Sequence, residues 1–182
     1  MKKWIFNAWY IKRDKQLYRF LTSGFIHKDW SHLAFNMFTL YFLGNGVELY
    51  FEIYFPGMST LLLLTLYISA IIISSIPGYF KHKDEPHYNS LGASGGVSAL
   101  VFCFIILAPT TPLCLLGILC FPGFIIGTVY LIYTIRMSKT RMDNINHEAH
   151  LWGAVFGMLF LLFVDYNVYL RFIEEVVNYN YF

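Results

Sequence analysis

A serine and a histidine stand at the starts of two long apolar segments, and their side chains suit nucleophilic chemistry. Ser94 lies in Gly92-Ala93-Ser94-Gly95-Gly96, and His150 opens another apolar run further along the chain. Serine is a weak nucleophile that needs an adjacent base, and a neutral imidazole is such a base. Because both residues begin apolar segments, the pair predicts peptide-bond hydrolysis within a membrane, with Ser94 and His150 as catalytic residues.

Glycines on both sides of Ser94 let a backbone or a substrate approach its hydroxyl closely. A helix that begins here also presents free N–H groups and the positive end of its dipole, which stabilise a developing oxyanion. The alternative is that Ala-Ser-Gly-Gly is only a small-residue packing face between membrane helices. The motif taken alone favours this alternative.

His150 precedes the pair Gly153-x-x-x-Gly157, which allows its helix to pack tightly against a neighbour. The spacing places His150 on or near that close-packed face. An ionisable residue that enters a membrane span is costly and is expected to be functional. The alternative is an interfacial histidine bonded to a loop, which describes His147 better.

The stretch His147-Glu148-Ala149-His150 also suggests a metal site. A zinc-binding H-E-x-x-H helix places its two histidines four residues apart, whereas these are three apart and no third ligand is evident. We therefore expect no metal ligands and no cofactor.

His32 and Asn36 share one face of a predicted helix, one turn apart. An imidazole and an amide are suitable oxyanion donors, although hydrogen bonding between helices would explain them as well. Asp143 is too far up a loop to orient His150, and Asp165 is at the opposite end of the His150 span. The sequence therefore predicts a Ser–His dyad rather than a triad.

Composition places these residues in a membrane protein. Of the 182 residues, 57% are hydrophobic and 13% are charged, whereas about a quarter are charged in soluble domains. The net charge of +2 is too small to indicate binding of nucleic acid. Cys103, Cys114 and Cys120 are odd in number and form no Cys-x-x-Cys pair, so we expect three small buried hydrophobic residues rather than a disulfide.

We expect an all-α membrane protein with one domain overall. Residues 1–30, rich in aromatic and basic side chains, are predicted to lie at the membrane interface. Residues 31–182 are predicted to form the transmembrane domain. Run lengths and Pro-Gly positions predict five spans: 31–50; 58–76, which stops at Pro77-Gly78; 92–108; 115–135, with a kink at Pro122-Gly123; and 150–163. Ser94, His150 and His32 then begin helices that enter from the same side of the membrane.

The ordered set of motifs resembles the rhomboid family of intramembrane serine proteases over nearly the whole chain. The matching motifs are Tyr18-Arg19, His32-x-x-x-Asn36, Gly44-x-x-x-Glu48, Gly92-Ala93-Ser94-Gly95 and Ala149-His150-x-x-Gly153-x-x-x-Gly157. The resemblance implies a rhomboid-like bundle in which Ser94 is the nucleophile and His150 the general base. It also implies an oxyanion hole made by His32, Asn36 and the backbone N–H of Ser94. The implied partners are transmembrane protein substrates and the lipid bilayer.

Three departures from the family pattern stand out. The span that precedes the first loop in the family is not seen, Ser98 stands where an aromatic residue often packs on the histidine, and Tyr18 replaces the usual Trp. One alternative function is therefore a catalytically inactive or truncated rhomboid-like protein that binds client membrane proteins. A small transporter or metal handler would need more ionisable residues at mid-depth than the sequence contains.

The expected location is a bacterial inner membrane, which the chain crosses several times. Two arguments predict opposite orientations of the chain in the membrane. All of the 13 Lys and Arg except Arg171 fall on the active-site side, so the positive-inside rule places that side in the cytoplasm. The rhomboid resemblance places it at the outer face, and we expect the outer face because the ordered motifs are more specific than a charge count.

Overall fold

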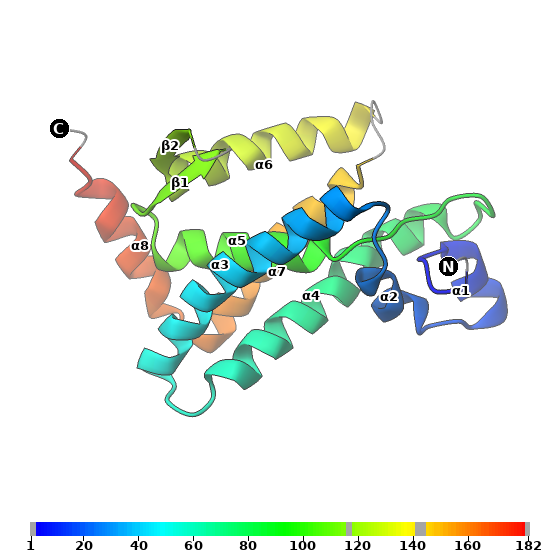
Figure 1. The fold of residues 1–182 in the computed structure, drawn as a ribbon, viewed down its shortest axis with the longest axis horizontal. Coiled ribbons are helices and arrows are strands. Elements are labelled where there is room, and N and C mark those ends of the chain that lie inside the picture. The colour runs from blue at the N-terminus through cyan, green and yellow to red at the C-terminus, as the bar shows by residue number, and fades with distance from the viewer. Residues whose placement is uncertain (1–2, 116–117, 141–144, 181–182) are drawn as a thin grey trace.

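Helices form most of the chain in the computed structural model, which describes residues 3–115, 118–140 and 145–180 (Figure 1). In chain order the elements are α1 (Ala8–Asp14), α2 (Arg19–Thr22), the 3₁₀ helix η1 (Ser23–Phe25), α3 (Trp30–Tyr54), α4 (Ser59–His82), α5 (Ser94–Leu107), β1 (Pro112–Leu115), β2 (Leu119–Pro122), α6 (Gly123–Thr140), α7 (His147–Val164) and α8 (Asn167–Val177). Asp143 lies outside the described residues.

The helix that begins with Ser94 is the central one. α5 contacts α3, α4, α6, α7 and α8, and most of its residues are buried. Small residues at its head allow neighbouring backbones to approach, and larger apolar residues such as Leu100 and Phe102 fill the core further along. The helix that carries Ser94 is therefore surrounded by other helices.

A β-hairpin replaces the first part of the predicted fourth span. β1 and β2 pair antiparallel, with Leu113 opposite Phe121, and helix α6 begins only at Gly123. The kink predicted at Pro122-Gly123 is therefore wrong. Pro122 has no N–H to donate and a fixed φ, which suits the end of a strand better than the interior of a helix.

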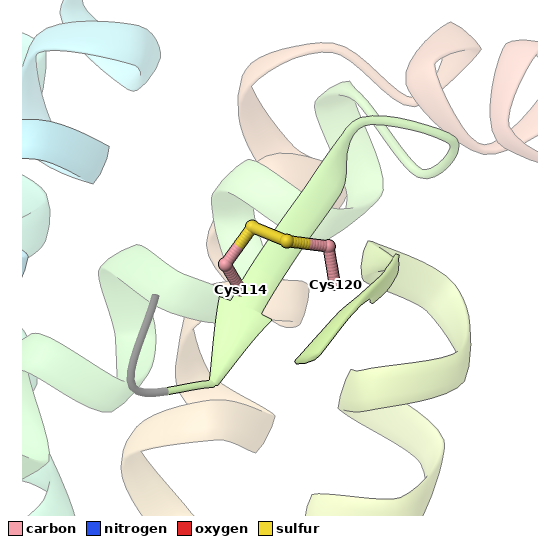
Figure 2. The surroundings of a disulfide bond; sticks show 2 residues. All are labelled: Cys114 and Cys120. Atoms are coloured by element: carbon pink, nitrogen blue, oxygen red, sulfur yellow. A yellow bond between two sulfur atoms is a disulfide. The ribbon is translucent and has the colours of Figure 1, made fainter. Parts of the chain in front are cut away.

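The hairpin contains a disulfide, which the sequence reasoning excluded. Cys114 and Cys120 are directly opposite each other in the register, and their sulfur atoms are bonded (Figure 2). The expectation of three buried, unpaired cysteines is correct only for Cys103. Strand pairing brings Cys114 and Cys120 together, in a stretch whose hydrophobicity predicts a helix.

Helix α4 continues past the predicted stop at Pro77-Gly78 and ends at His82. A proline inside a helix removes one backbone hydrogen bond, but membrane helices tolerate this where neighbouring groups satisfy the freed backbone. The predicted end of this span was therefore too early.

Two of the described helices, α4 and α7, are long and apolar enough to cross a membrane. α5 is apolar but has 14 residues. α3 and α6 have the length of a span but carry polar residues, among them Asn45 and Glu52 in α3 and Arg136 in α6. The predicted count of five spans remains a prediction.

The two ends of the bundle are built differently. α1 and α2 lie at one end, and the hairpin and α8 lie at the other (Figure 1). At the first end Phe6 pairs with Ser90 through the backbone, and Arg19, almost fully buried, donates to the carbonyl of Ile5. The Phe6–Ser90 pairing joins the N-terminal segment to the loop that leads into α5, and the Arg19 hydrogen bond holds the segment itself together.

Candidate active site

Ser94 is the first residue of α5, and the chain reaches it through a constrained loop. The N–H of Gly92 donates to the carbonyl of Ser23 at 2.9 Å. Gly92 has a φ of 115°, a backbone conformation that residues with a side chain rarely adopt. Ser94 therefore lies at a helix N-terminus, where the first N–H groups have no partner within the helix.

Helices α5 and α7 touch through their backbones next to the catalytic candidates. A Cβ placed on Gly153 would lie 2.1 Å from the carbonyl oxygen of Gly95, and one placed on Gly157 would lie 2.3 Å from that of Ala99. Glycine is therefore required at both positions. Gly95 follows Ser94 and Gly153 lies one turn after His150, so this contact brings the two helix heads side by side.

His150 has a hydrogen-bond partner on a third helix. Its Nδ1 lies 3.0 Å from the hydroxyl of Tyr130, which belongs to α6. The ring of His147 lies beside it, with the two ring centroids 6.1 Å apart. The contact from Ser94 Oγ to His150 Nε2 remains a prediction.

His32 lies directly over the loop that precedes Ser94. A Cβ on Gly92 would be 2.7 Å from Cε1 and 3.0 Å from Nε2 of the His32 ring. Gly92 is thus required by both its backbone conformation and this ring. His32, from α3, therefore lies against a residue that is two positions before the predicted nucleophile, Ser94.

Asn36 is one turn further along the same face of α3 and is 2% exposed. Its Nδ2 has no hydrogen-bond partner among the described residues. Buried polar groups are almost always paired, so an unpaired amide needs an explanation. One explanation is that the Asn36 amide is a hydrogen-bond donor to an oxyanion that forms during a reaction.

His27 was not identified from the sequence, yet it belongs to this corner of the molecule. Its ring packs edge-on against His32, with centroids 5.1 Å apart. Burial, and secondarily the nearby His32, lower the pKa of His27. His27 therefore favours its neutral form beside the predicted oxyanion donors.

The remaining candidates are not part of the site. Asp165 bonds with Arg171 and Tyr50 at the far end of α7, as expected from its position in the sequence. Glu148 forms an ion pair with Lys81 at 2.9 Å. Within the described part of the chain, no group of three or more His, Cys, Asp or Glu residues could hold a metal ion.

Tyr130 is the residue near His150 that sequence reasoning missed. The departure at Ser98 leaves two alternatives, either another ring that holds His150 or a less firmly held His150, and nothing in the sequence points to the source of such a ring. A weak signal exists in α6, where Tyr130 and Thr134 are four residues apart and so share a face. Thr134 is completely buried.

Comparison with known proteins identifies the family of the chain. The family model of the Rhomboid domain matches residues 14–167. The chain is 28% identical over 157 residues to RHOMBOID-like protein 12, mitochondrial, of Arabidopsis thaliana, covering 78% of this chain and 45% of that protein. It is 27% identical over 168 residues to Rhomboid-related protein 1 of Caenorhabditis elegans, covering 90% and 44%. It is 26% identical over 176 residues to Rhomboid-like protein 11, chloroplastic, of Arabidopsis thaliana, covering 85% and 52%.

Fold and site together define a helical membrane protein with a serine and a histidine at adjacent helix heads. The chain belongs to the rhomboid family, and it is therefore embedded in a membrane. It spans about half the length of the relatives it matches. Two of these relatives are named as organellar and none is bacterial, so they give no support to the expected bacterial inner membrane.

Proposed function

We propose that this chain is an intramembrane serine protease that cleaves transmembrane segments of other membrane proteins through Ser94 and His150. The observation that carries the proposal is the backbone contact between Gly95 and Gly153, since it sets the heads of α5 and α7 side by side. Membership of a family that includes serine proteases supports the same reading.

In the proposed reaction Ser94 Oγ attacks the scissile carbonyl while His150 Nε2 takes the hydroxyl proton. The C–N bond of the peptide then breaks as the imidazolium returns that proton to the leaving amine. Water hydrolyses the resulting acyl-enzyme, with His150 again acting as base.

The negative charge on the carbonyl oxygen needs donors that are already in place. The unpaired Nδ2 of Asn36, the His32 ring over Gly92 and the backbone N–H of Ser94 are the donors we assign. An amide that finds no acceptor in the described fold is free to donate to this oxyanion.

Labelling with a fluorophosphonate probe tests the proposal directly. Purified wild-type protein in detergent or liposomes is expected to be labelled, and Ser94→Ala and His150→Ala are expected to lose the label. Ser75→Ala is the matched control, because its hydroxyl donates to the carbonyl of Ile71 within its own helix, α4.

Thermal melting of each variant shows whether the protein is folded. A folded wild-type protein without labelling would contradict the proposal and would favour a catalytically inactive rhomboid-like protein that binds membrane clients. Labelling that survives Ser94→Ala would place the nucleophile elsewhere.

A further inference from the structure

Tyr130 reaches His150 from a helix that carries none of the motif residues. Its hydroxyl lies 3.0 Å from Nδ1 of His150, and its ring packs against Phe102 of α5 with centroids 6.0 Å apart. The side chains of Ser98 and Thr134 lie beside the same hydroxyl. Tyr130 therefore links α5, α6 and α7 at the predicted active site.

We propose that Tyr130 is the positioning residue of His150, with Ser98 as the acceptor that orients the tyrosine. In this arrangement Nδ1–H of His150 donates to the phenolic oxygen, and the phenolic O–H donates to Ser98. Nε2 is left unprotonated for Ser94. The inference rests on the proposed function, in which His150 is the general base.

The protonation state of the ring gives this contact its importance. A neutral imidazole carries one hydrogen, on either Nδ1 or Nε2, and the partner of one nitrogen decides which. If Tyr130 donated to Nδ1, Nε2 would hold the hydrogen and could not accept a proton from Ser94. Only a Tyr130 that accepts from Nδ1 leaves His150 able to act as a base.

A tyrosine that accepts a hydrogen bond from Nδ1 must still donate its own hydroxyl hydrogen to an acceptor. An unpaired donor in a buried site is costly, so the phenol needs an acceptor. Ser98 and Thr134 both offer hydroxyl oxygens, and Thr134 Oγ1 makes no hydrogen bond of ordinary geometry with a described residue. Either hydroxyl can therefore receive the phenolic hydrogen, and the location of Ser98 favours it.

Ser98 is one helical turn after Ser94, so the two hydroxyls share a face of α5. The nucleophile and the acceptor for the tyrosine thus lie along one line beside His150. Ser98 and Tyr130 therefore act as a pair, with the ring supplied from α6.

The expected contribution is modest. A neutral phenol orients the imidazole but cannot offset the charge of the imidazolium as a carboxylate does. Loss of one neutral hydrogen bond should lower kcat roughly 2- to 10-fold and leave KM unchanged, because the contact is not with the substrate.

Nitrogen NMR of histidine-labelled full-length protein tests the tautomer independently of activity. The His150 signals are assigned by their loss in His150→Gln. We expect wild type to carry the hydrogen on Nδ1, and Tyr130→Phe to show a mixture of tautomers. A wild-type ring protonated on Nε2, or an unchanged tautomer in Tyr130→Phe, would overturn the proposal.

Kinetics with a transmembrane substrate gives the second readout. Tyr130→Phe is expected to lower kcat by the stated factor, Ser98→Ala to lower it less, and the two together to be hardly worse than Tyr130→Phe. Tyr133→Phe is the matched control, since Tyr133 is on the same helix but packs on His147. Unchanged kcat in a folded Tyr130→Phe would overturn the proposal. If wild type neither labels nor cleaves, the proposed function fails, and the NMR result still decides whether Tyr130 orients His150.

Discussion

Two buried polar groups at this site reduce the stability of the fold, and packing alone does not explain why they are there. The amide nitrogen Nδ2 of Asn36 and the ring nitrogen Nε2 of His27 are both buried, and neither has a hydrogen-bond partner among the described residues. Both belong to the corner around His32 and Gly92. Such costs are typical of positions kept for chemistry, since a stable fold alone would have paired or removed these groups.

Asn36→Ala is expected to slow cleavage on the order of 10²-fold, because it removes one oxyanion donor. The same change should leave the melting temperature nearly unchanged or slightly higher, since no hydrogen bond to a described residue is lost from Nδ2. Cleavage assays and thermal melting of the same preparation measure both effects. A large fall in melting temperature with normal turnover of the folded fraction would instead assign Asn36 to helix packing.

The lowered pKa of His27 predicts how the free energy of unfolding changes with pH. Burial lowers its pKa below the ordinary value of 6.5, so the unfolded chain binds a proton before the folded chain does. The free energy of unfolding should therefore fall as the pH drops from about 7 through the lowered pKa. His27→Gln removes this contribution and should give a flatter profile.

Melting temperatures at several pH values between neutral and mildly acid measure the profile. His87→Gln, at an exposed histidine of the loop before α5, is the control and should keep the wild-type slope. Equal slopes in wild type and His27→Gln would show that His27 does not contribute.

At the scale of elements, the α5–α7 contact decides where Ser94 and His150 lie. Helices pack this closely only where no side chain separates the backbones, and Gly153 and Gly157 provide that for α7. α6 contacts the same pair and brings Tyr130 to His150. The site is therefore assembled by helix packing, and its precision depends on glycine.

Gly157→Ala should be strongly destabilising, because its Cβ would lie 2.3 Å from the carbonyl oxygen of Ala99. Relief of that clash requires a shift of one backbone, which costs ~1–3 kcal/mol or more. The shift should also lower fluorophosphonate labelling of the fraction that remains folded, since it moves α7 relative to Ser94.

Gly78→Ala is the matched control for this experiment. Gly78 is also a helical glycine, but a Cβ there meets nothing within 4 Å. Alanine should be neutral or stabilising by up to about 1 kcal/mol, because it has the higher helix propensity. Similar melting temperatures for Gly157→Ala and wild type would show that α5 and α7 are not in this contact.

At the scale of the whole molecule, the two ends differ in charge and in cysteine chemistry. By sequence position, all Lys and Arg except Arg171 belong to the active-site end. The hairpin that contains the Cys114–Cys120 disulfide lies at the other end (Figure 1). Disulfides persist in oxidising compartments, and basic residues favour the side from which a protein inserts. Both observations indicate that the hairpin end faces the oxidising side.

This orientation is opposite to the one expected from the family resemblance, and labelling with an impermeant thiol reagent decides between the two. We expect Met58→Cys, at the hairpin end, to be labelled in intact cells and Asp84→Cys, at the active-site end, only after lysis. The native cysteines should give little background, because Cys103 is buried and the other two are bonded. Labelling of Asp84→Cys in intact cells would restore the outer-face orientation.

The sequence by itself determined the identity of the candidate groups and the order of the apolar helices. Ser94, His150, His32 and Asn36 follow from side-chain chemistry and helical spacing, which are local properties. The start of α5 and the close-packed face of α7 follow from glycines whose effect is also local. The family resemblance rested on these same residues, and the match over residues 14–167 confirms it.

Only the tertiary structure decided the contacts between segments distant in the sequence. The hydrogen bond between Tyr130 and His150 joins α6 to α7, and the Gly92–His32 contact joins a loop to α3. The Cys114–Cys120 bond depends on strand pairing in a stretch whose hydrophobicity suits a helix equally well. Hydrophobic runs specify that a segment is buried, but neither its partner nor, over a short run, its secondary structure, because these depend on packing against the rest of the chain.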